Sequence, residues 1–331
     1  MLARPLQTAM AEPASTVVRP KRWLSWPKVS VAAVGAAAVA AAVVIGTTGG
    51  TVPAGHSDAA PQAVESPQVV ESPLVKLASA VKAAGTQPGE ASLIINTKFA
   101  PDGTPNLYYT VYTDKGQVFR GDSPQSLAAS VAKGAAENAT PYDAKVMAAA
   151  RLAANGDVEK ARVAMLTAAG NALGVGLSPA EADKAWAQAQ AEIAEQFRKH
   201  GKKVPDPRPR PTGKDLENLI GNHLWSSATH ALFIGAANAE VRAGVLKLLA
   251  TMKDVTVGTT DIDGQAALAL TASPAIQGGG STHILTVNAD NGLPMRSEGI
   301  PAKDSAEPSK PWVANYKSSR VTLADVAAGK F

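Results

Sequence analysis

One segment near the start of the chain limits its topology more than any other feature. No charged residue occurs between Val29 and Gly55, and valine, isoleucine and alanine fill most of residues 29–46. Roughly 20 apolar residues span the core of a bilayer, so this segment is just long enough to cross it. The sequence therefore predicts a transmembrane helix at residues 29–46, weakly hydrophobic because alanine dominates it.

The residues just before this segment carry positive charges and aromatic rings. They are Arg19, Lys21, Arg22, Trp23, Trp26 and Lys28. Tryptophan favours the membrane interface and basic residues favour the cytoplasmic side, so these side chains are predicted to anchor the helix among membrane lipids. The prediction is a single-pass plasma-membrane protein with a cytoplasmic tail, residues 1–28, and an extracytoplasmic C-terminal domain.

Two other interpretations of the segment stay open. A cleavable secretory signal would need a small-residue site, such as Val52-Pro53-Ala54 or Ala38-Val39-Ala40. The proline disfavours the first site, and the second would cut the apolar run in half. Export is common to the anchor and the signal peptide. A helix buried in a soluble core is the third interpretation, and it would make the flanking charge accidental.

Composition excludes several classes of function. The chain has no cysteine, which removes disulfides, thiolate metal sites and cysteine nucleophiles. The net charge of +4 belongs to residues 1–28, because basic and acidic residues are equal in number after them. The basic tail therefore indicates topology, and no nucleic-acid partner is expected.

The rest of the sequence predicts a tether and one α+β domain. Residues 47–73 are rich in Gly, Pro, Ser and Ala and form a low-complexity tether before a domain at residues 74–331. Helices are predicted at 74–84, 124–137, 141–155, 157–173, 179–200, 212–232 and 239–252. Strands are predicted at 92–99, 107–113, 117–120, 255–260, 266–272, 284–288 and 293–297, with an edge strand at 312–323. This order favours a mostly antiparallel curved sheet packed on helices, with a helical insertion at about 124–200.

Part of the domain resembles a known group of proteins. The helix from Val241 runs into Val255-Thr-Val257, the turn Asp261-Ile-Asp-Gly264 follows, and the strand Ile284–Asn288 leads to the hairpin ending at Gly292. With the basic tail, anchor and tether, this is similar to actinobacterial single-pass membrane proteins of unknown function. The resemblance implies an extracytoplasmic domain shaped like lipoprotein carriers or envelope-stress sensors. It carries over no catalytic residues.

Catalytic motifs in the sequence are weak. Two Ser-x-x-Lys tetrads, Ser79–Lys82 and Ser130–Lys133, have the spacing of penicillin-interactive enzymes, but the partner motifs Ser-Asp-Asn and Lys-Thr-Gly are missing. His223 and His230 stand two helical turns apart, too far for a shared metal ion, and Asp261–Gly264 is predicted to be a hairpin turn without calcium. The sequence thus predicts no enzyme, no metal site and no cofactor.

The large aromatic side chains suggest a ligand-binding role. They are predicted to fill the core or to line a hydrophobic cleft between sheet and helices, and they are Trp186, Phe197, Trp225, Phe233 and Trp312. The first hypothesis is a binding or sensing protein of the bacterial cell envelope, with a lipid, peptide or envelope protein as ligand. The alternatives are an envelope enzyme such as a cell-wall hydrolase and a structural protein-interaction module.

Overall fold

The computed structural model describes residues 72–99, 103–302 and 311–331, which belong to one compact unit, Ser66–Phe331. The predicted tail, transmembrane helix and nearly all of the tether lie outside the described residues, so these stay predictions. Within the described ranges, no helix combines the length and the apolar character that a membrane crossing requires.

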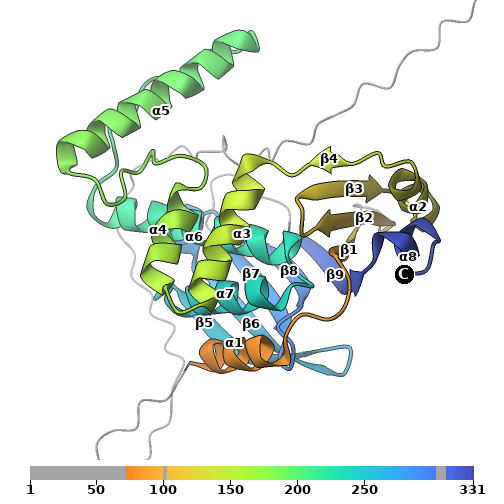
Figure 1. The fold of residues 1–331 in the computed structure, drawn as a ribbon. Helices are drawn as coiled ribbons and strands as arrows, with labels where there is room; N and C mark the ends of the chain where they lie inside the picture. Colours follow the sequence, from red (N-terminus) through yellow and green to blue (C-terminus); the bar gives the residue numbers. More distant parts are fainter. Residues whose placement is uncertain (1–71, 100–102, 303–310) are drawn as a thin grey trace, which may run out of the picture. The chain divides into compact units, whose positions relative to one another are not determined.

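The described residues form an α+β fold with a curved antiparallel sheet (Figure 1). The strands are β1 (Ala91–Phe99), β2 (Pro105–Thr113), β3 (Gln117–Gly121), β4 (Glu137–Asn138), β5 (Val255–Ile262), β6 (Gln265–Ala272), β7 (Ser281–Asn288), β8 (Pro294–Pro301) and β9 (Trp312–Val321). The helices are α1 (Pro73–Ala84), α2 (Pro124–Ala132), α3 (Pro141–Ala154), α4 (Val158–Thr167), α5 (Pro179–Lys199), α6 (Gly213–Ile234), α7 (Ala239–Ala250) and α8 (Leu323–Ala327), with a short 3-10 helix, η2 (Pro274–Gln277).

Strand β9 joins the two halves of the sheet. The strand order is β4-β3-β2-β1-β9-β8-β7-β6-β5, and every pair of neighbours is antiparallel. Val321 lies opposite Ala91 of β1, and Trp312 lies opposite Gly299 of β8. The predicted edge strand at 312–323 is therefore wrong. Alternation along a segment identifies a strand but not its neighbours, and here the last strand pairs with the first, more than 200 residues earlier in the sequence.

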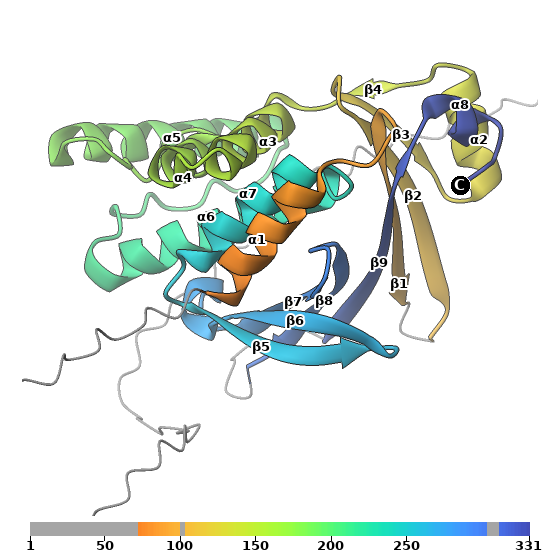
Figure 2. The same ribbon diagram turned by 60° about the horizontal axis from the view of Figure 1, so that its bottom comes forward.

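The two faces of the sheet carry different helices. In β1, the Ser92 hydroxyl faces the loop between α6 and α7, whereas the next residue, Leu93, is buried with Leu127 of α2 and Val326 of α8. Successive side chains of a strand point to opposite faces, so α2 and α8 form a small cap on one side. Figure 2 shows this cap at the end of β1–β3 and the larger helical layer, with α1, α6 and α7, on the other side.

The main core lies between this larger helical layer and the sheet. It contains α1, α3, α4, α6 and α7 together with strands β6 and β7. Close packing is reached at Gly244 of α7, where an added Cβ would overlap the carbonyl oxygen of Ala150 in α3. Of the predicted helical insertion at about 124–200, α3 and α4 contribute to this core, α2 belongs to the cap on the other face, and α5 stands away from both (Figure 1).

Candidate functional site

The described part of the chain contains an open pocket of mixed polar and apolar lining between the β2–β3 turn and α3, which we call the polar pocket after its ionisable side chains. Its volume is about 180 Å³, and the end of α6 completes its wall. The side chains that give it chemical character are Tyr112, Asp114, Lys115, Asp143, Arg151 and Ile234. A hydrolase is expected to have two carboxylates in one pocket, so the bonding partners of each carboxylate bear on what this pocket can do.

The carboxylate of Asp143, on α3, is bound by neighbouring side chains through both of its oxygens. Its Oδ2 accepts hydrogen bonds from the backbone N–H and the hydroxyl of Thr140, both at 2.8 Å, and these bonds cap the helix. Its Oδ1 lies 2.6 Å from Nε2 of His230 on α6. Partial burial alone would raise the pKa of Asp143, but the bonds from His230 and Thr140 outweigh it and lower the pKa of this carboxyl.

Neighbouring groups fix His230 in this pair. The ring of Tyr142 lies against the His230 imidazole at a tilt of 30°, with 5.3 Å between centroids, and its hydroxyl lies 3.0 Å from Oγ of Ser227. Burial raises the pKa of the Tyr142 phenol, which therefore stays protonated near neutral pH. Ser227 is hydrogen-bonded to the tyrosine and His230 to the aspartate, so these two residues do not form the serine–histidine pair that activates a nucleophile.

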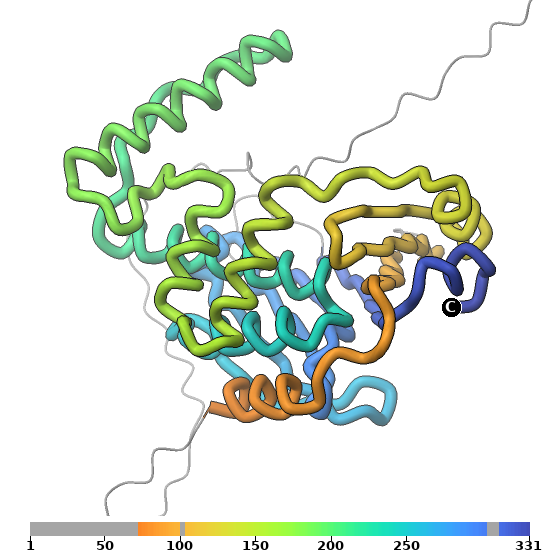
Figure 3. The backbone as a smooth tube through the Cα atoms, in the orientation of Figure 1, coloured from red at the N-terminus to blue at the C-terminus, as the bar shows by residue number. Residues whose placement is uncertain are grey.

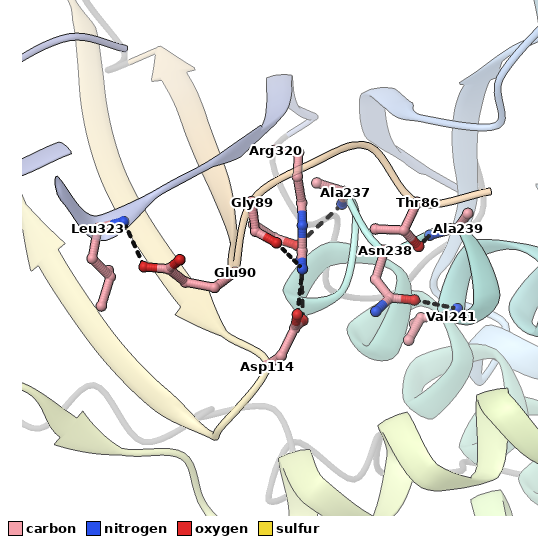
Figure 4. Close-up of polar contacts among 11 residues, drawn as sticks. Thr86, Gly89, Glu90, Asp114, Ala237, Asn238, Ala239, Val241, Arg320 and Leu323 are labelled. Atoms are coloured by element: carbon pink, nitrogen blue, oxygen red, sulfur yellow. Dashed lines mark hydrogen bonds and ion pairs between the residues drawn. The ribbon is translucent and has the colours of Figure 1, made fainter. Parts of the chain in front are cut away.

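Asp114, the other carboxylate of the pocket, is bound by an arginine from the central strand. Arg320 of β9 contacts both oxygens of Asp114, and its Nη2 also donates to the carbonyl oxygen of Gly89 at 2.9 Å (Figure 4). Only 5% of the Arg320 side chain is exposed. Asp114 is thus paired with Arg320, and Asp143 with His230. Both carboxylates of the pocket are engaged in bonds within the fold.

The N-terminus of α7 is a second polar cluster, and side chains fill it. The hydroxyl of Thr86 accepts from the backbone N–H of Ala239, and the amide oxygen of Asn238 accepts from that of Val241 (Figure 4). Such N–H groups bind anions when they are unoccupied. Here they are used by the protein itself, so this cluster fastens α7 to the β1 loop.

A buried cation lies one turn further along α7. Arg242 is 8% exposed and donates to the backbone carbonyl oxygens of Ala236 and Asn291. Burial lowers the pKa of the Arg242 guanidinium to about 10. The contacts to carbonyls on two loops give Arg242 a structural role, since it ties the α6–α7 loop to the β7–β8 loop.

The structure does not gather the five aromatic residues predicted to line a cleft. Trp225 is buried in the main core, and Phe233 stacks on Tyr316 with 4.5 Å between ring centroids. The ring of Trp312 contacts His283, and the indole overlies the Cα of Gly299 on the neighbouring strand. Trp186 and Phe197 both belong to α5. None of the five lines the polar pocket, so the cleft remains a prediction without geometric support.

Other residues singled out by the sequence have structural roles. Lys82 donates to the carbonyl oxygen of Ala154 at 2.8 Å, which ties α1 to the C-terminus of α3 and directs Lys82 away from nucleophile activation. Burial lowers the pKa of His223. The Asp261 carboxylate accepts from Gly264 N–H at 2.8 Å in the β5–β6 hairpin, which confirms the predicted turn. In the described ranges, no group of three or more acidic or histidine side chains is suited to a metal ion.

Sequence reasoning missed the polar residues that now matter most. Asp114 and Arg320 are far apart in the chain, and no local pattern links them. Asp143 did carry a signal, because Thr140-Pro-Tyr-Asp143 has the form of a capping box. Arg242 also carried one, as a charged residue on a helix that is otherwise buried.

The most exposed element is an arm, which we define as residues 171–211. Helix α5 runs outward, and the proline-rich connector 200–211 returns to α6 (Figure 3). The connector is fastened to the base of the helix: Nε1 of Trp186 donates to the carbonyl oxygen of Arg208 at 2.8 Å. Arg210 reaches the carbonyl oxygen of Leu173 at 3.1 Å and lies 3.6 Å from Asp183. Of the side chains of α5, only Ala182 and Trp186 are buried.

Comparison of the chain with known protein families, with curated proteins and with solved structures finds no match. The functional argument therefore depends on the site geometry and on the sequence.

Proposed function

We propose that the protein is a non-enzymatic interaction module of the bacterial cell envelope, held at the outer face of the plasma membrane by its N-terminal segment. The topology in this proposal is the one that the apolar segment 29–46 and its basic flank predict. The interaction role is supported by the described domain, where polar residues near the pocket are committed to structural bonds.

The proposed interaction role depends on one observation, the exposure of the arm. Ordering a residue costs roughly 1–2 kcal/mol of backbone entropy, which folded domains usually offset by burial. Helix α5 has 21 residues, yet only Ala182 and Trp186 of them are buried. The arm therefore adds little to the stability of the domain, and a long ordered projection of this kind is best explained by contact with a partner.

A lipid-carrier role receives less support from the structure. A carrier needs an apolar cleft large enough for acyl chains. The helices α1, α6 and α7 instead fill the helical face of the sheet with close-packed core side chains, among them Leu232, Leu246 and Leu248. This favours an interaction module over the carrier that the sequence also suggested.

The proposed topology is tested by labelling single cysteines in intact cells. The chain has no cysteine, so Ala191→Cys on α5 and Ser15→Cys in the tail each give one reactive site. We expect a membrane-impermeant maleimide to label Ala191→Cys in whole cells and Ser15→Cys only after lysis. Labelling of Ser15→Cys in whole cells, or release of the labelled domain into the medium, would contradict the anchored topology.

The hydrolase alternative retains one observation, the shared pocket of Asp114 and Asp143. It predicts that purified full-length protein releases soluble fragments from cell-wall polymer and that Asp143→Asn abolishes the release. We expect no release from either protein, because Asp114 is bound by Arg320 and Asp143 by His230 and Thr140.

A further inference from the structure

The outer end of the arm carries a concentrated positive charge. The basic residues at the end of α5 and at the start of the connector are exposed, and they are Arg198, Lys199, Lys202 and Lys203. Lys199 pairs with Glu195 one turn earlier, and no acidic residue occurs among residues 198–203. Beyond residue 28, the rest of the chain has more acidic than basic residues. The charge at this end is therefore local, and the domain as a whole does not share it.

The fold holds this charge in a defined position. The Trp186–Arg208 hydrogen bond and the contacts of Arg210 fasten the connector to the base of α5. Alternating prolines, from Pro205 to Pro211, restrict the backbone between these contacts. An open hollow of about 350 Å³ lies along the connector between Lys203 and Arg208. Basic side chains on a stiff support lose less entropy on binding than those on a loose tail.

We propose that residues 198–203, the basic tip of the arm, bind the anionic phospholipid headgroups of the membrane in which the chain is anchored. The inference rests on the proposed function, because it requires the domain to stay close to a bilayer. Exposed Lys and Arg side chains are attracted to anionic lipid over about a Debye length, roughly 8 Å at physiological salt. The tip must therefore reach the surface itself.

The length of α5 carries the tip away from the body of the domain. Helix α5, with 21 residues, is about 30 Å long at 1.5 Å per residue, and Figure 1 shows it projecting from the other helices. A bound tip would orient the domain on the membrane instead of leaving it free on its tether.

The test uses the full-length chain in lipid nanodiscs. Gln196→Cys, exposed in the last turns of α5, is labelled with a fluorophore in discs that contain headgroup spin-labelled lipid. We expect quenching in discs rich in phosphatidylglycerol, little quenching in phosphatidylcholine discs, and loss of quenching in 1 M salt. Lys202→Glu with Lys203→Glu should weaken the contact at least tenfold.

A matched variant controls for total charge. Lys133→Glu with Lys145→Glu makes the same change at two exposed lysines of the body, and its quenching should equal that of the parent. Failure of the chain to remain in the discs would overturn the proposed anchored function. Retention in the discs with no quenching, with equal quenching in neutral lipid, or with equal loss in both variants would overturn the tip contact alone. Stronger binding of duplex DNA than of anionic discs at equal phosphate and salt would overturn the choice of lipid.

Discussion

Helices α3 and α5 are similar in composition, but α3 is packed into the core and α5 is largely exposed. Both are rich in alanine, and both begin with a capping box after a serine or threonine, at Thr140 and Ser178. Yet α3 buries Val146 and four alanines against its neighbours, whereas α5 buries only Ala182 and Trp186. The difference lies in the partners. Small residues on α3 meet Gly244 of α7, which belongs to the main core, whereas Ala182 of α5 meets Gly174 and Trp186 meets the connector, both within the arm. Close approach of small residues therefore adds to the core only where the partner is itself part of that core.

The largest expected loss of stability comes from adding a side chain where α3 and α7 pack most closely. Gly244→Ala would place a methyl group on the carbonyl oxygen of Ala150, and the two helices would have to separate. Overpacking of this kind costs about 3 kcal/mol, which lowers the Tm by roughly 6–12 °C in a domain of this size. Thermal unfolding followed by circular dichroism measures the change. Gly258→Ala in β5 is the control, because nothing lies within 4 Å of the added Cβ, and an equal loss there would contradict the packing argument.

The next effect concerns the bond between the sheet and the β2–β3 turn. Arg320→Ala removes the partner of Asp114 and leaves the Gly89 carbonyl oxygen without its donor. We expect a loss of about 2 kcal/mol in unfolding free energy, less than for a fully buried pair because Asp114 is 41% exposed. Urea unfolding is the measurement. Arg198→Ala on the arm removes the same side chain from an exposed position and should change nothing. A similar loss from both would show that exposure does not separate the two regions.

A pH experiment compares a carboxyl of the body, Asp143, with a carboxyl of the arm, Glu195. The pKa of Asp143 is lowered mainly by the bonds from His230 and Thr140, which overcome its burial, and the pKa of Glu195 is lowered by its bond to Lys199. A carboxyl whose pKa is lower in the folded protein stabilises the fold at pH values above its pKa in the unfolded chain, which is near 4. This stabilisation disappears as the pH falls through the pKa of the folded state. The stability gap between the parent and Asp143→Asn should therefore shrink between pH 6 and pH 2.

Glu195→Gln is the companion measurement on the arm. Its pKa is lowered too, but the side chain is exposed on a helix outside the core. Global unfolding should therefore have the same pH dependence in the parent and in Glu195→Gln. A gap for Asp143→Asn that stays constant with pH would show that the Asp143–His230 bond does not contribute through charge.

The sequence predicted the elements well and their partners poorly. Apolar periodicity and capping residues located α3, α5, α6 and α7 to within a few residues, because these signals are local. It could not show that β9 would be central, since its pairing with β1 spans most of the chain. It also could not separate α3 from α5, because an amphipathic pattern does not say which surface will cover the apolar face.

The candidate site was harder still to predict. Five aromatic residues were assumed to share a cleft because such side chains are rare in this chain, but the fold distributes them over α5, α6 and β9. The polar pocket depends on contacts such as that of Asp143 with His230, which lie 87 residues apart in the sequence. Distant polar pairs leave no periodic trace, so only the folded chain shows them.

The smallest global effect is expected from the largest side chain of the arm. Trp186 is 5% exposed, and its indole donates to Arg208, so burial alone would suggest a costly truncation. Its surroundings belong to the arm, however, and the arm can loosen while the body stays folded. Trp186→Ala should thus change the global unfolding free energy by less than about 0.5 kcal/mol but strongly accelerate amide hydrogen exchange across residues 178–211. Exchange in the helices of the body is the internal control, and a loss of protection there equal to that in the arm would mean that the two regions unfold as one unit.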